Sequence, residues 1–192
     1  MEKGIIFIIS GPSGSGKSTI INEFLKKHKN DFFLSISATT REPRKSEIDG
    51  KDYYFYTKEK FKELIKKDMF LEYAKILGNF YGTPKKPIFD AINKGKNVIM
   101  DIDIQGVKKI RKKLKFYVTI FIIPPSFKEL EKRLNKRKTD SKKSINERLK
   151  LAKKELKERN SYDYIIVNKN IKETVNMLEY VVKFEKLRNY KI

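Results

Sequence analysis

The stretch "GPSGSGKST" at residues 11–19 decides the fold of this chain of 192 residues. It follows the apolar run Ile5–Ile9 and matches the pattern G-x-x-x-x-G-K-[ST], in which glycines let backbone N–H groups curl around phosphate oxygens. A helix beginning near Lys17 would add its positive dipole end. From average residue frequencies, a chance match in a chain of this length is on the order of 1%. The stretch therefore predicts a phosphate-binding loop between a strand and a helix.

The residue types of this loop predict a nucleoside triphosphate as its ligand. Lys17 is expected to reach the β- and γ-phosphates, and the hydroxyl of Ser18 to coordinate Mg²⁺. GTPases, motor ATPases and small-molecule kinases share the motif, so it does not predict what happens to the γ-phosphate. The residues expected to bind the triphosphate are Gly11, Pro12, Ser13, Gly14, Ser15, Gly16, Lys17, Ser18 and Thr19.

Short apolar runs alternate with helical patterns along the chain. After Ile5–Ile9, such runs lie at Val98–Met100, Val118–Ile123 and Tyr164–Val167. Continuous apolar runs are typical of strands that are covered on both faces in a parallel sheet. We therefore predict an α/β fold of three layers with a parallel central sheet, whose ligands lie at the carboxyl ends of the strands.

Two segments interrupt this alternation. Residues 37–86 contain the aromatic stretch "DYYFYT" (52–57), which is typical of an antiparallel strand, and we expect them to form an inserted lobe with a mixed β-sheet. Residues 126–158 are highly charged, and the serines at Ser126 and Ser144 each open a capping box, so we expect a helical lid there. The rest would form the core, namely residues 1–36, 87–125 and 159–192.

Composition restricts the partners of the chain. A formal net charge of +21 indicates phosphate-bearing partners, but the lysines occur in pairs all along the chain, which favours a solvated surface over a nucleic-acid-binding face. The absence of cysteine excludes disulfides and cysteine–zinc sites. Ile5–Ile9 is too short for a signal-peptide core, and no stretch approaches the roughly 20 apolar residues of a membrane span. We expect a cytoplasmic monomer or small homo-oligomer with no membrane and no specific nucleic-acid partner.

A second set of motifs resembles the guanylate kinases. The stretch "SATTREPRKSEIDGKDYY" (37–54) is similar to the acceptor-binding segment of that family. The motifs "FLEYA", "GNFYGT", "DIDIQG", "PPS" and "IVN" follow in the family's order at nearly its spacing, so the resemblance covers essentially the whole chain. It implies transfer of the γ-phosphoryl group of MgATP to GMP, and also to dGMP, giving ADP and GDP in purine nucleotide metabolism.

The resemblance also implies which residues bind GMP. The phosphate would be held by Arg41, Arg44, Tyr53 and Tyr81, with Glu47 in the same segment. The guanine base would be read by Ser37, Glu72, Thr83 and Asp103. A carboxylate such as Glu72 can accept from N1–H and the exocyclic amine of guanine, and a hydroxyl such as Ser37 can donate to O6. Adenine would leave these polar groups unpaired, at a cost of roughly 1–3 kcal/mol each.

Catalysis would then consist of positioning and charge neutralisation, because the attacking phosphate oxygen is already deprotonated at neutral pH. Asp101 and Asp103 end an apolar strand, and their spacing predicts that both carboxylates point to one face of it. We expect Asp101 to bind Mg²⁺ through a water molecule. By resemblance, Asn168 would lie near the adenine. The cations expected at the phosphates are Lys17, Arg41, Arg133, Arg137 and Arg148.

Three departures from the family pattern affect the loops. Ser46 stands where the family has glycine, Lys136 and Lys138 flank Arg137 in place of two glycines, and Lys169 follows Asn168 in place of an acid. They bear on the shape of the acceptor loop, the flexibility of the lid and the adenine pocket.

Three other functions remain open. The first is a kinase for AMP or a pyrimidine nucleotide; Ser37, Glu72 and the Arg41–Arg44 pair argue against it. The second is a family member that has lost catalysis and binds a protein, which the complete phosphate loop argues against. The third is a basic nucleic-acid-binding ATPase, which would bind DNA or RNA in a strongly salt-dependent way.

Overall fold

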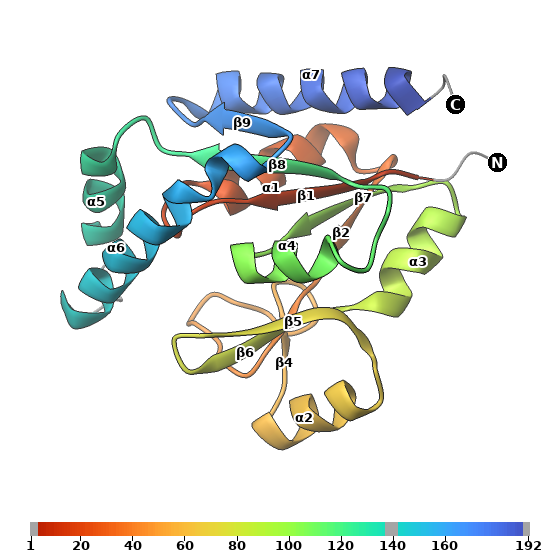
Figure 1. Ribbon diagram of the computed structural model, residues 1–192, viewed down its shortest axis with the longest axis horizontal. Coiled ribbons are helices and arrows are strands. Elements are labelled where there is room, and N and C mark those ends of the chain that lie inside the picture. The colour runs from red at the N-terminus through yellow and green to blue at the C-terminus, as the bar shows by residue number, and fades with distance from the viewer. Residues whose placement is uncertain (1–3, 137–141, 190–192) are drawn as a thin grey trace. The chain divides into compact units, whose positions relative to one another are not determined.

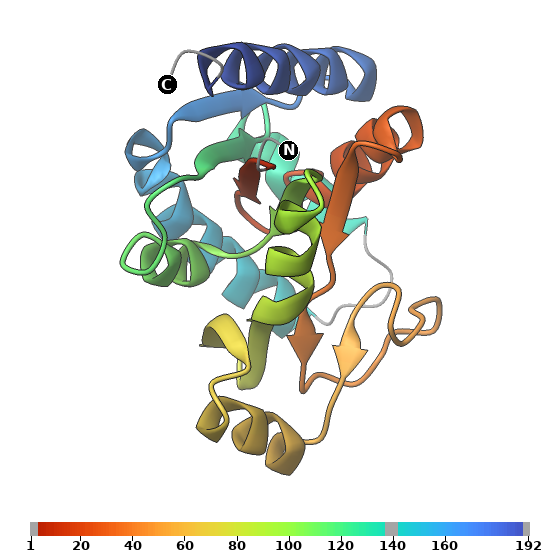
Figure 2. The same cartoon turned by 90° about the vertical axis from the view of Figure 1, so that its right-hand side faces the viewer.

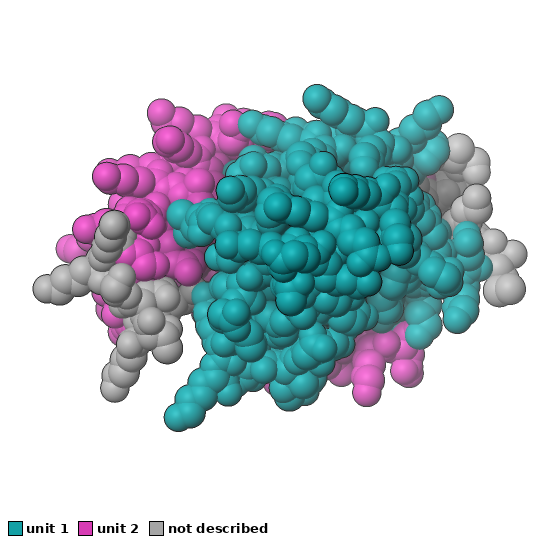
Figure 3. Space-filling view, turned by 90° about the horizontal axis from the view of Figure 1, so that it is seen from below, with its two compact units in different colours: residues 1–7, 31–117 teal, residues 8–30, 118–192 magenta. Residues whose placement is uncertain are grey.

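The computed structural model describes residues 4–136 and 142–189. They form an α/β fold with a parallel five-stranded sheet and a second, mixed four-stranded sheet (Figure 1), which confirms the predicted fold class. The chain divides into two compact units, residues 1–7 with 31–117 and residues 8–30 with 118–192, called unit 1 and unit 2 here (Figure 3).

Strands and helices alternate over most of the described chain. The strands are β1 (Ile6–Ser10), β2 (Phe32–Ser35), β3 (Ala38–Thr39), β4 (Tyr54–Phe55), β5 (Phe70–Ile76), β6 (Asn79–Pro84), β7 (Asn97–Asp101), β8 (Val118–Ile123) and β9 (Tyr164–Val167). The helices are α1 (Lys17–His28), α2 (Lys58–Lys66), α3 (Lys85–Asn93), α4 (Ile104–Ile110), α5 (Phe127–Asn135), α6 (Lys142–Lys157) and α7 (Ile171–Asn189), with a 3-10 turn at Arg159–Ser161. The strand orders are β2-β7-β1-β8-β9 and β4-β3-β6-β5.

In unit 1, β2 and β7 pair in parallel, with Phe32 opposite Asn97 and Ser35 opposite Met100. The first four residues of β7 are buried, as predicted for a strand covered on both faces. Helix α3 packs against both strands (Figure 2). The strand β2 was not predicted, because its residues "FFLS" give only three apolar positions, two of them half-buried.

The second sheet lies within residues 37–86 and is mixed, as predicted. β5 and β6 are antiparallel, β3 is antiparallel to β6, and β3 is parallel to β4. The prediction of an antiparallel strand in "DYYFYT" was therefore wrong: only Tyr54 and Phe55 form β4, and its ladder partner is parallel. Alternating aromatics indicate a half-buried strand but not the direction of its partner. The direction depends on the connection, and residues 40–53 are long enough for the crossover that parallel strands need.

In unit 2, β8 and β9 pair in parallel from Ile120 opposite Tyr164 to Ile123 opposite Val167. Helix α7 packs against β9 and α1 (Figure 1). Helices α5 and α6 share a small apolar core, whose buried residues are Leu130, Leu134, Ile145 and Ala152.

Of the two predicted capping boxes, one opens a helix. The hydroxyl of Ser126 accepts a hydrogen bond from the Glu129 N–H at 3.1 Å, so α5 begins as predicted. Ser144 does not cap α6, because that helix already begins at Lys142. A serine and a glutamate three residues apart are also neighbours on one face inside a helix, so the spacing alone does not fix the helix start.

The division into core (1–36, 87–125, 159–192), lobe (37–86) and lid (126–158) stays a prediction. Over the described residues, every helix is too short or too polar to cross a membrane.

Candidate functional site

The phosphate loop joins β1 to α1 in unit 2 and turns on glycines. Gly11 and Gly16 have φ values of +143° and +93°, in the region that favours glycine. A Cβ at Gly11 would lie 2.1 Å from the carbonyl oxygen of Ile122, and one at Gly16 would lie 2.3 Å from Nδ2 of Asn168. Atoms of Ile122 and Asn168 therefore pack directly against the loop backbone, and at these two positions only glycine fits.

The charges at the loop favour an anion. Lys17 extends back over the loop, where its Nζ donates to the carbonyl of Gly11 at 2.7 Å. Helix α1 has no acidic residue in its first turn, so no side chain there offsets the positive end of its dipole. Ser18 and Thr19 are exposed on the same turn. A triphosphate at this helix end would meet backbone N–H groups, hydroxyls and an ammonium group.

Two residues predicted to contact ATP lie behind this loop. Asn168, which follows β9, donates from Nδ2 to the carbonyl of Ser15 at 2.8 Å. The guanidinium of Arg133 donates from Nη1 to the same carbonyl at 3.4 Å and from Nη2 to the carbonyl of Asn168 at 3.2 Å. Its Nε donates to Glu129 at 3.0 Å. The structure thus brings Asn168 and Arg133 together at the Ser15 carbonyl.

A second arginine of the predicted set reaches the loop from α6. Nη1 of Arg148 donates to the hydroxyl of Ser13 at 3.1 Å. Arg137 lies outside the described residues, so its predicted role is not addressed by the structure.

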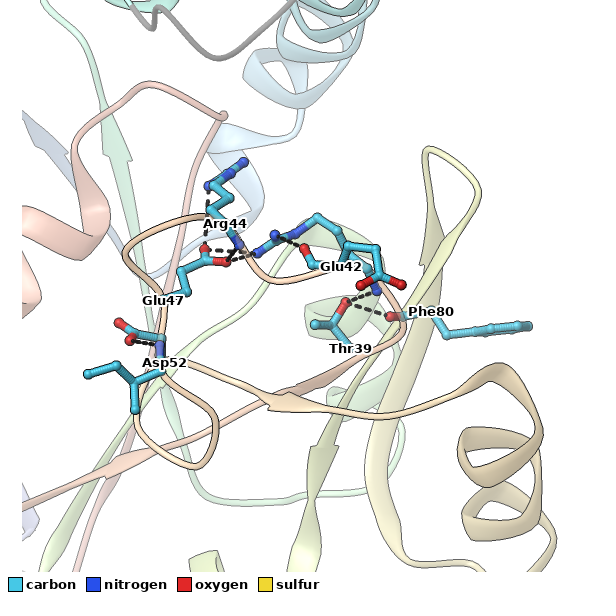
Figure 4. A network of polar contacts seen from close by, with 8 residues as sticks. Thr39, Glu42, Arg44, Glu47, Asp52 and Phe80 are labelled. Atoms are coloured by element: carbon cyan, nitrogen blue, oxygen red, sulfur yellow. Dashed lines mark hydrogen bonds and ion pairs between the residues drawn. The ribbon is translucent and has the colours of Figure 1, made fainter.

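In unit 1, Arg41 and Arg44 converge on Glu47 (Figure 4). Nη2 of Arg41 lies 2.9 Å from both carboxylate oxygens of Glu47, and the backbone N–H of Arg44 donates to Oε2 at 2.7 Å. Burial tends to lower the pKa of Arg41, but the hydrogen bond and charge of Glu47 outweigh burial and raise this pKa. Side-chain exposure is 17% for Arg41 and 42% for Arg44, so the second arginine presents its charge more openly.

The two predicted tyrosines lie beside this cluster. The rings of Tyr53 and Tyr81 meet edge to face, with centroids 6.2 Å apart, and Cζ of Arg41 lies 5.6 Å from the Tyr53 centroid. Burial, and next the carboxylate of Asp101, raise the pKa of Tyr53. Its phenol therefore stays protonated at neutral pH and can donate a hydrogen bond.

A buried carboxylate and a hydroxyl meet on the adjacent strands β5 and β6. Glu72 is 4% exposed and lies opposite Thr83, whose Oγ1 donates to Oε1 of Glu72 at 2.6 Å. Burial raises the pKa of Glu72 to about 7, and the nearby Asp103 carboxylate contributes in the same direction. Helix α4 approaches closely here, because a Cβ at Gly106 would lie 2.8 Å from Oε2 of Glu72.

Of the predicted pair, Asp101 ends the strand, but the placement of Asp103 in the same strand was wrong. β7 ends at Asp101, whereas Asp103 is the N-cap of α4 and accepts from the backbone N–H groups of Gln105 at 2.6 Å and Gly106 at 3.1 Å. The period-two rule applies only inside a strand, and aspartate is among the preferred N-cap residues. Ser37 lies between β2 and β3, where its carbonyl accepts from the Tyr54 N–H at 2.9 Å.

The residues proposed for Mg²⁺ suit a nucleotide-borne ion. Among the described residues, no three or more histidine, cysteine, aspartate or glutamate side chains gather in a metal site. Mg²⁺ usually keeps several waters and takes one or two protein oxygens besides substrate phosphates. Ser18 in unit 2 is exposed and Asp101 in unit 1 is half-buried, and each carries a hard oxygen donor of that kind. Their joint role at one ion stays a prediction.

Three further residues that shape these sites were not predicted. Two had a signal in the sequence: Glu129 lies four residues before Arg133, the spacing of a helical ion pair, and a glycine in a helix such as Gly106 often marks a close approach. The third, Thr174, has its Oγ1 3.1 Å from Oδ1 of Asn168 and had no such signal.

Comparison with known proteins agrees with the resemblance found in the motifs. The family model described as guanylate kinase matches residues 3–185. A guanylate kinase of Clostridium tetani is 46% identical over 98% of this chain and 89% of its own length, and one of Clostridium perfringens is 47% identical over 97% and 86%. The crystal structure of guanylate kinase from Anaplasma phagocytophilum superimposes with a TM-score of 0.81 at 36% identity, covering 96% of this chain and 87% of that one. This chain therefore belongs to the guanylate kinase family, a family of nucleoside monophosphate kinases.

Proposed function

We infer that this chain is a guanylate kinase that transfers the γ-phosphoryl group of MgATP to GMP, giving ADP and GDP. The observation that carries this proposal is the buried Glu72–Thr83 pair, in the same unit as the Arg41–Glu47–Arg44 cluster. A buried carboxylate with a hydroxyl partner suits the donor edge of guanine, and clustered arginines suit a phosphate. Unit 2 supplies a complete phosphate loop for the triphosphate.

Guanine recognition is assigned to four residues of unit 1. The carboxylate of Glu72 would accept from guanine N1–H and the exocyclic amine. Hydroxyl groups and a second carboxylate complete the set, from Ser37, Thr83 and Asp103. The carboxylate of Asp103 already caps α4, so its contribution to the base comes from the lone pairs that the two backbone N–H groups leave. AMP presents different donors and acceptors on this edge and is rejected.

The phosphate of GMP is assigned to Arg41, Arg44, Tyr53 and Tyr81. Glu47 holds the guanidinium of Arg41 and the backbone of Arg44, so these two groups are ordered before the phosphate arrives. The neutral phenols add directional hydrogen bonds without more charge. None of the residues assigned to base or phosphate addresses the ribose 2′-hydroxyl, so dGMP is accepted as well.

Phosphoryl transfer is assigned to positioning and charge. Lys17, Arg148 and Arg137 would neutralise the charge that develops on the transferred group, together with Arg41 at the acceptor. Arg133 would join them by exchanging its carbonyl partners at Ser15 and Asn168 for phosphate oxygens. Ser18, and Asp101 through water, would hold the Mg²⁺ that accompanies ATP, and this ion would supply positive charge beside the phosphates. The phosphate oxygen of GMP is ionised at neutral pH, so the protein need not remove a proton.

In this proposal residues 37–86 act as the GMP-binding lobe and residues 126–158 as a lid that closes over ATP. Small-angle scattering with GMP and a non-hydrolysable ATP analogue should report a smaller radius of gyration than the free protein. An unchanged radius would refute closure without affecting the assignment of the reaction. The cytoplasmic location and the monomeric or small homo-oligomeric state stay predictions.

A nucleotide panel tests the reaction. ADP release is measured with MgATP plus GMP, dGMP, AMP, UMP or dTMP, with and without added RNA and DNA. We expect turnover with GMP and dGMP alone. Comparable turnover with AMP would refute the base assignment, and turnover that needs nucleic acid but no GMP would indicate an ATPase.

A further inference from the structure

The side chain of Asn168 faces the phosphate loop and is buried, with 5% of the residue exposed. Its Nδ2 donates to the carbonyl of Ser15 at 2.8 Å. This partner fixes the amide orientation, because a carbonyl oxygen can only accept and the donor of the asparagine side chain is its NH₂ group. Its Oδ1 lies 3.1 Å from Oγ1 of Thr174. The backbone is engaged as well, since the N–H donates to Ile123 at 2.8 Å and the carbonyl accepts from Arg133. Every polar group of Asn168 thus has a partner within unit 2.

The hydrogen bond to Ser15 controls the direction of a neighbouring N–H group. The peptide between Ser15 and Gly16 is planar and trans, so its C=O and N–H point in opposite directions. Holding the Ser15 carbonyl toward Asn168 therefore turns the N–H of Gly16 away from Asn168. Gly16 is the N-cap of α1, and N–H groups at such loop and helix starts are the ligands of bound phosphate.

Gly16 shows how closely the amide supports the loop. A Cβ there would lie 2.3 Å from Nδ2 of Asn168, so any side chain would displace the amide from the Ser15 carbonyl. Arg133 supports the same carbonyl with a charged donor, but at 3.4 Å its bond is the longer of the two. The asparagine amide is accordingly the principal support of this peptide plane.

We propose that Asn168 is a positioning residue of the phosphate loop, acting through the Ser15 carbonyl on the triphosphate and not on the adenine ring. The resemblance to the family had implied a place near the adenine for this residue. The inference depends on the proposed function only in taking a nucleoside triphosphate as the ligand of the loop.

Nucleotide binding without turnover tests this role. The variant Asn168→Asp keeps the shape of the side chain but places a carboxylate oxygen against the Ser15 carbonyl. Dissociation constants for ATP and UTP are measured by displacement of a ribose-labelled fluorescent ADP, with Mg²⁺ and at one salt concentration. We expect both affinities to fall by the same factor, about tenfold for one lost hydrogen bond, while the ratio between ATP and UTP and the affinity for GMP stay unchanged.

A matched control and a second variant keep the test decisive. Asn22→Asp makes the same chemical change on the exposed side of α1 and should alter neither affinity. Loss of GMP binding would reveal that Asn168→Asp fails to fold. In that case Asn168→Ala, which removes the donor without adding charge, is tested by the same ratio between the ATP and UTP affinities. Weaker ATP binding with unchanged UTP binding would overturn the inference, because Asn168 would then read the base. Unchanged affinity for both nucleotides would also overturn it. If the parent protein bound no triphosphate at all, the proposed function would fail with it.

Discussion

Thr83 donates a hydrogen bond to Glu72 across adjacent strands, with 2.6 Å between Oγ1 and Oε1. Both residues are buried, and they lie directly opposite one another in the β5–β6 ladder. Burial raises the pKa of Glu72 to about 7, while this hydrogen bond opposes the rise. The pKa of this carboxyl group therefore lies in the neutral range, and only its ionised form accepts from both donors of guanine.

The variant Thr83→Val should shift the pH dependence of GMP use. It removes a hydrogen bond that stabilises the ionised carboxylate, so the pKa of Glu72 rises further. In the parent protein the KM for GMP should increase as pH falls through about 7. In Thr83→Val the same increase should begin at higher pH, whereas Thr83→Ser, which keeps the hydroxyl, should follow the parent.

The measurement is the KM for GMP at saturating ATP between about pH 5 and 9, a range that brackets the transition on both sides. Identical pH profiles for the parent and Thr83→Val would show that this hydroxyl does not tune the base-reading carboxylate.

The variant Glu72→Gln should increase stability at alkaline pH while it weakens GMP binding far more than ATP binding. The pKa of Glu72 in the folded protein, about 7, lies above the ordinary value of 4.5. The stability linked to protonation is therefore complete below pH 4.5 and is lost as pH rises through about 7. Glutamine stays neutral and escapes this loss. The free energy of unfolding of the variant, relative to the parent, should therefore be greater at about pH 8 than at about pH 4, by about 3 kcal/mol.

Denaturant unfolding at several pH values measures this difference, and GMP and ATP binding are measured in parallel. Glu63→Gln is the matched control, because Glu63 is an exposed carboxylate of the same unit whose pKa is lowered by Lys67 and Lys60. The free energy of unfolding of Glu63→Gln, relative to the parent, should not increase as pH rises. If the free energy of unfolding of Glu72→Gln relative to the parent did not change with pH, the pKa of Glu72 would not be raised in the folded protein. Equal loss of GMP and ATP binding would show that Glu72 does not bind the guanine base.

The parts of the fold that depend on local geometry could be predicted from the sequence. The phosphate loop needs glycines at fixed positions because its backbone adopts positive φ, and Gly95 ends α3 with a φ of +74° for the same reason. The buried runs of β7 and β8 were visible as continuous apolar stretches. For β9 the strand was predicted correctly but its burial on both faces was wrong, because only Ile166 is buried and Ile165 is exposed. In each case the residue type follows from its own backbone or its burial, without knowledge of the partner.

The parts that depend on a distant partner could not be predicted. Asp103 could continue a strand or cap a helix, and the choice follows from where β7 ends. The amide of Asn168 binds Ser15, which lies far away in sequence, and no spacing rule connects them. The direction of β4 is likewise set by the route of residues 40–53 and not by its own aromatics.

The variant Glu47→Gln should weaken GMP use and leave ATP binding unchanged. Glu47 holds the guanidinium of Arg41 at 2.9 Å and the backbone of Arg44 at 2.7 Å, so it fixes both arginines for the phosphate. Glutamine keeps an acceptor but loses the charge, and we expect the KM for GMP to rise by about tenfold, as for one weakened charged hydrogen bond. Glu42→Gln, an exposed carboxylate in the same loop, is the control and should not alter the KM. A lower KM for GMP in Glu47→Gln would show that the carboxylate competes with the phosphate and does not order its ligands.

The variant Lys17→Ala should reduce turnover by about a thousandfold while the fold is retained, since the ammonium group acts on the transferring phosphate. Lys17 donates a hydrogen bond to the Gly11 carbonyl and is not among the buried residues of the apolar core. Circular dichroism and GMP affinity should therefore match the parent protein. Lys26→Ala removes a lysine of the same helix that pairs with Glu23 at the surface, and it should leave kcat unchanged.

The kcat of both variants is measured with saturating MgATP and GMP. Near-normal turnover in Lys17→Ala would remove this lysine from the reaction, and equal losses in both variants would point to a general effect of charge.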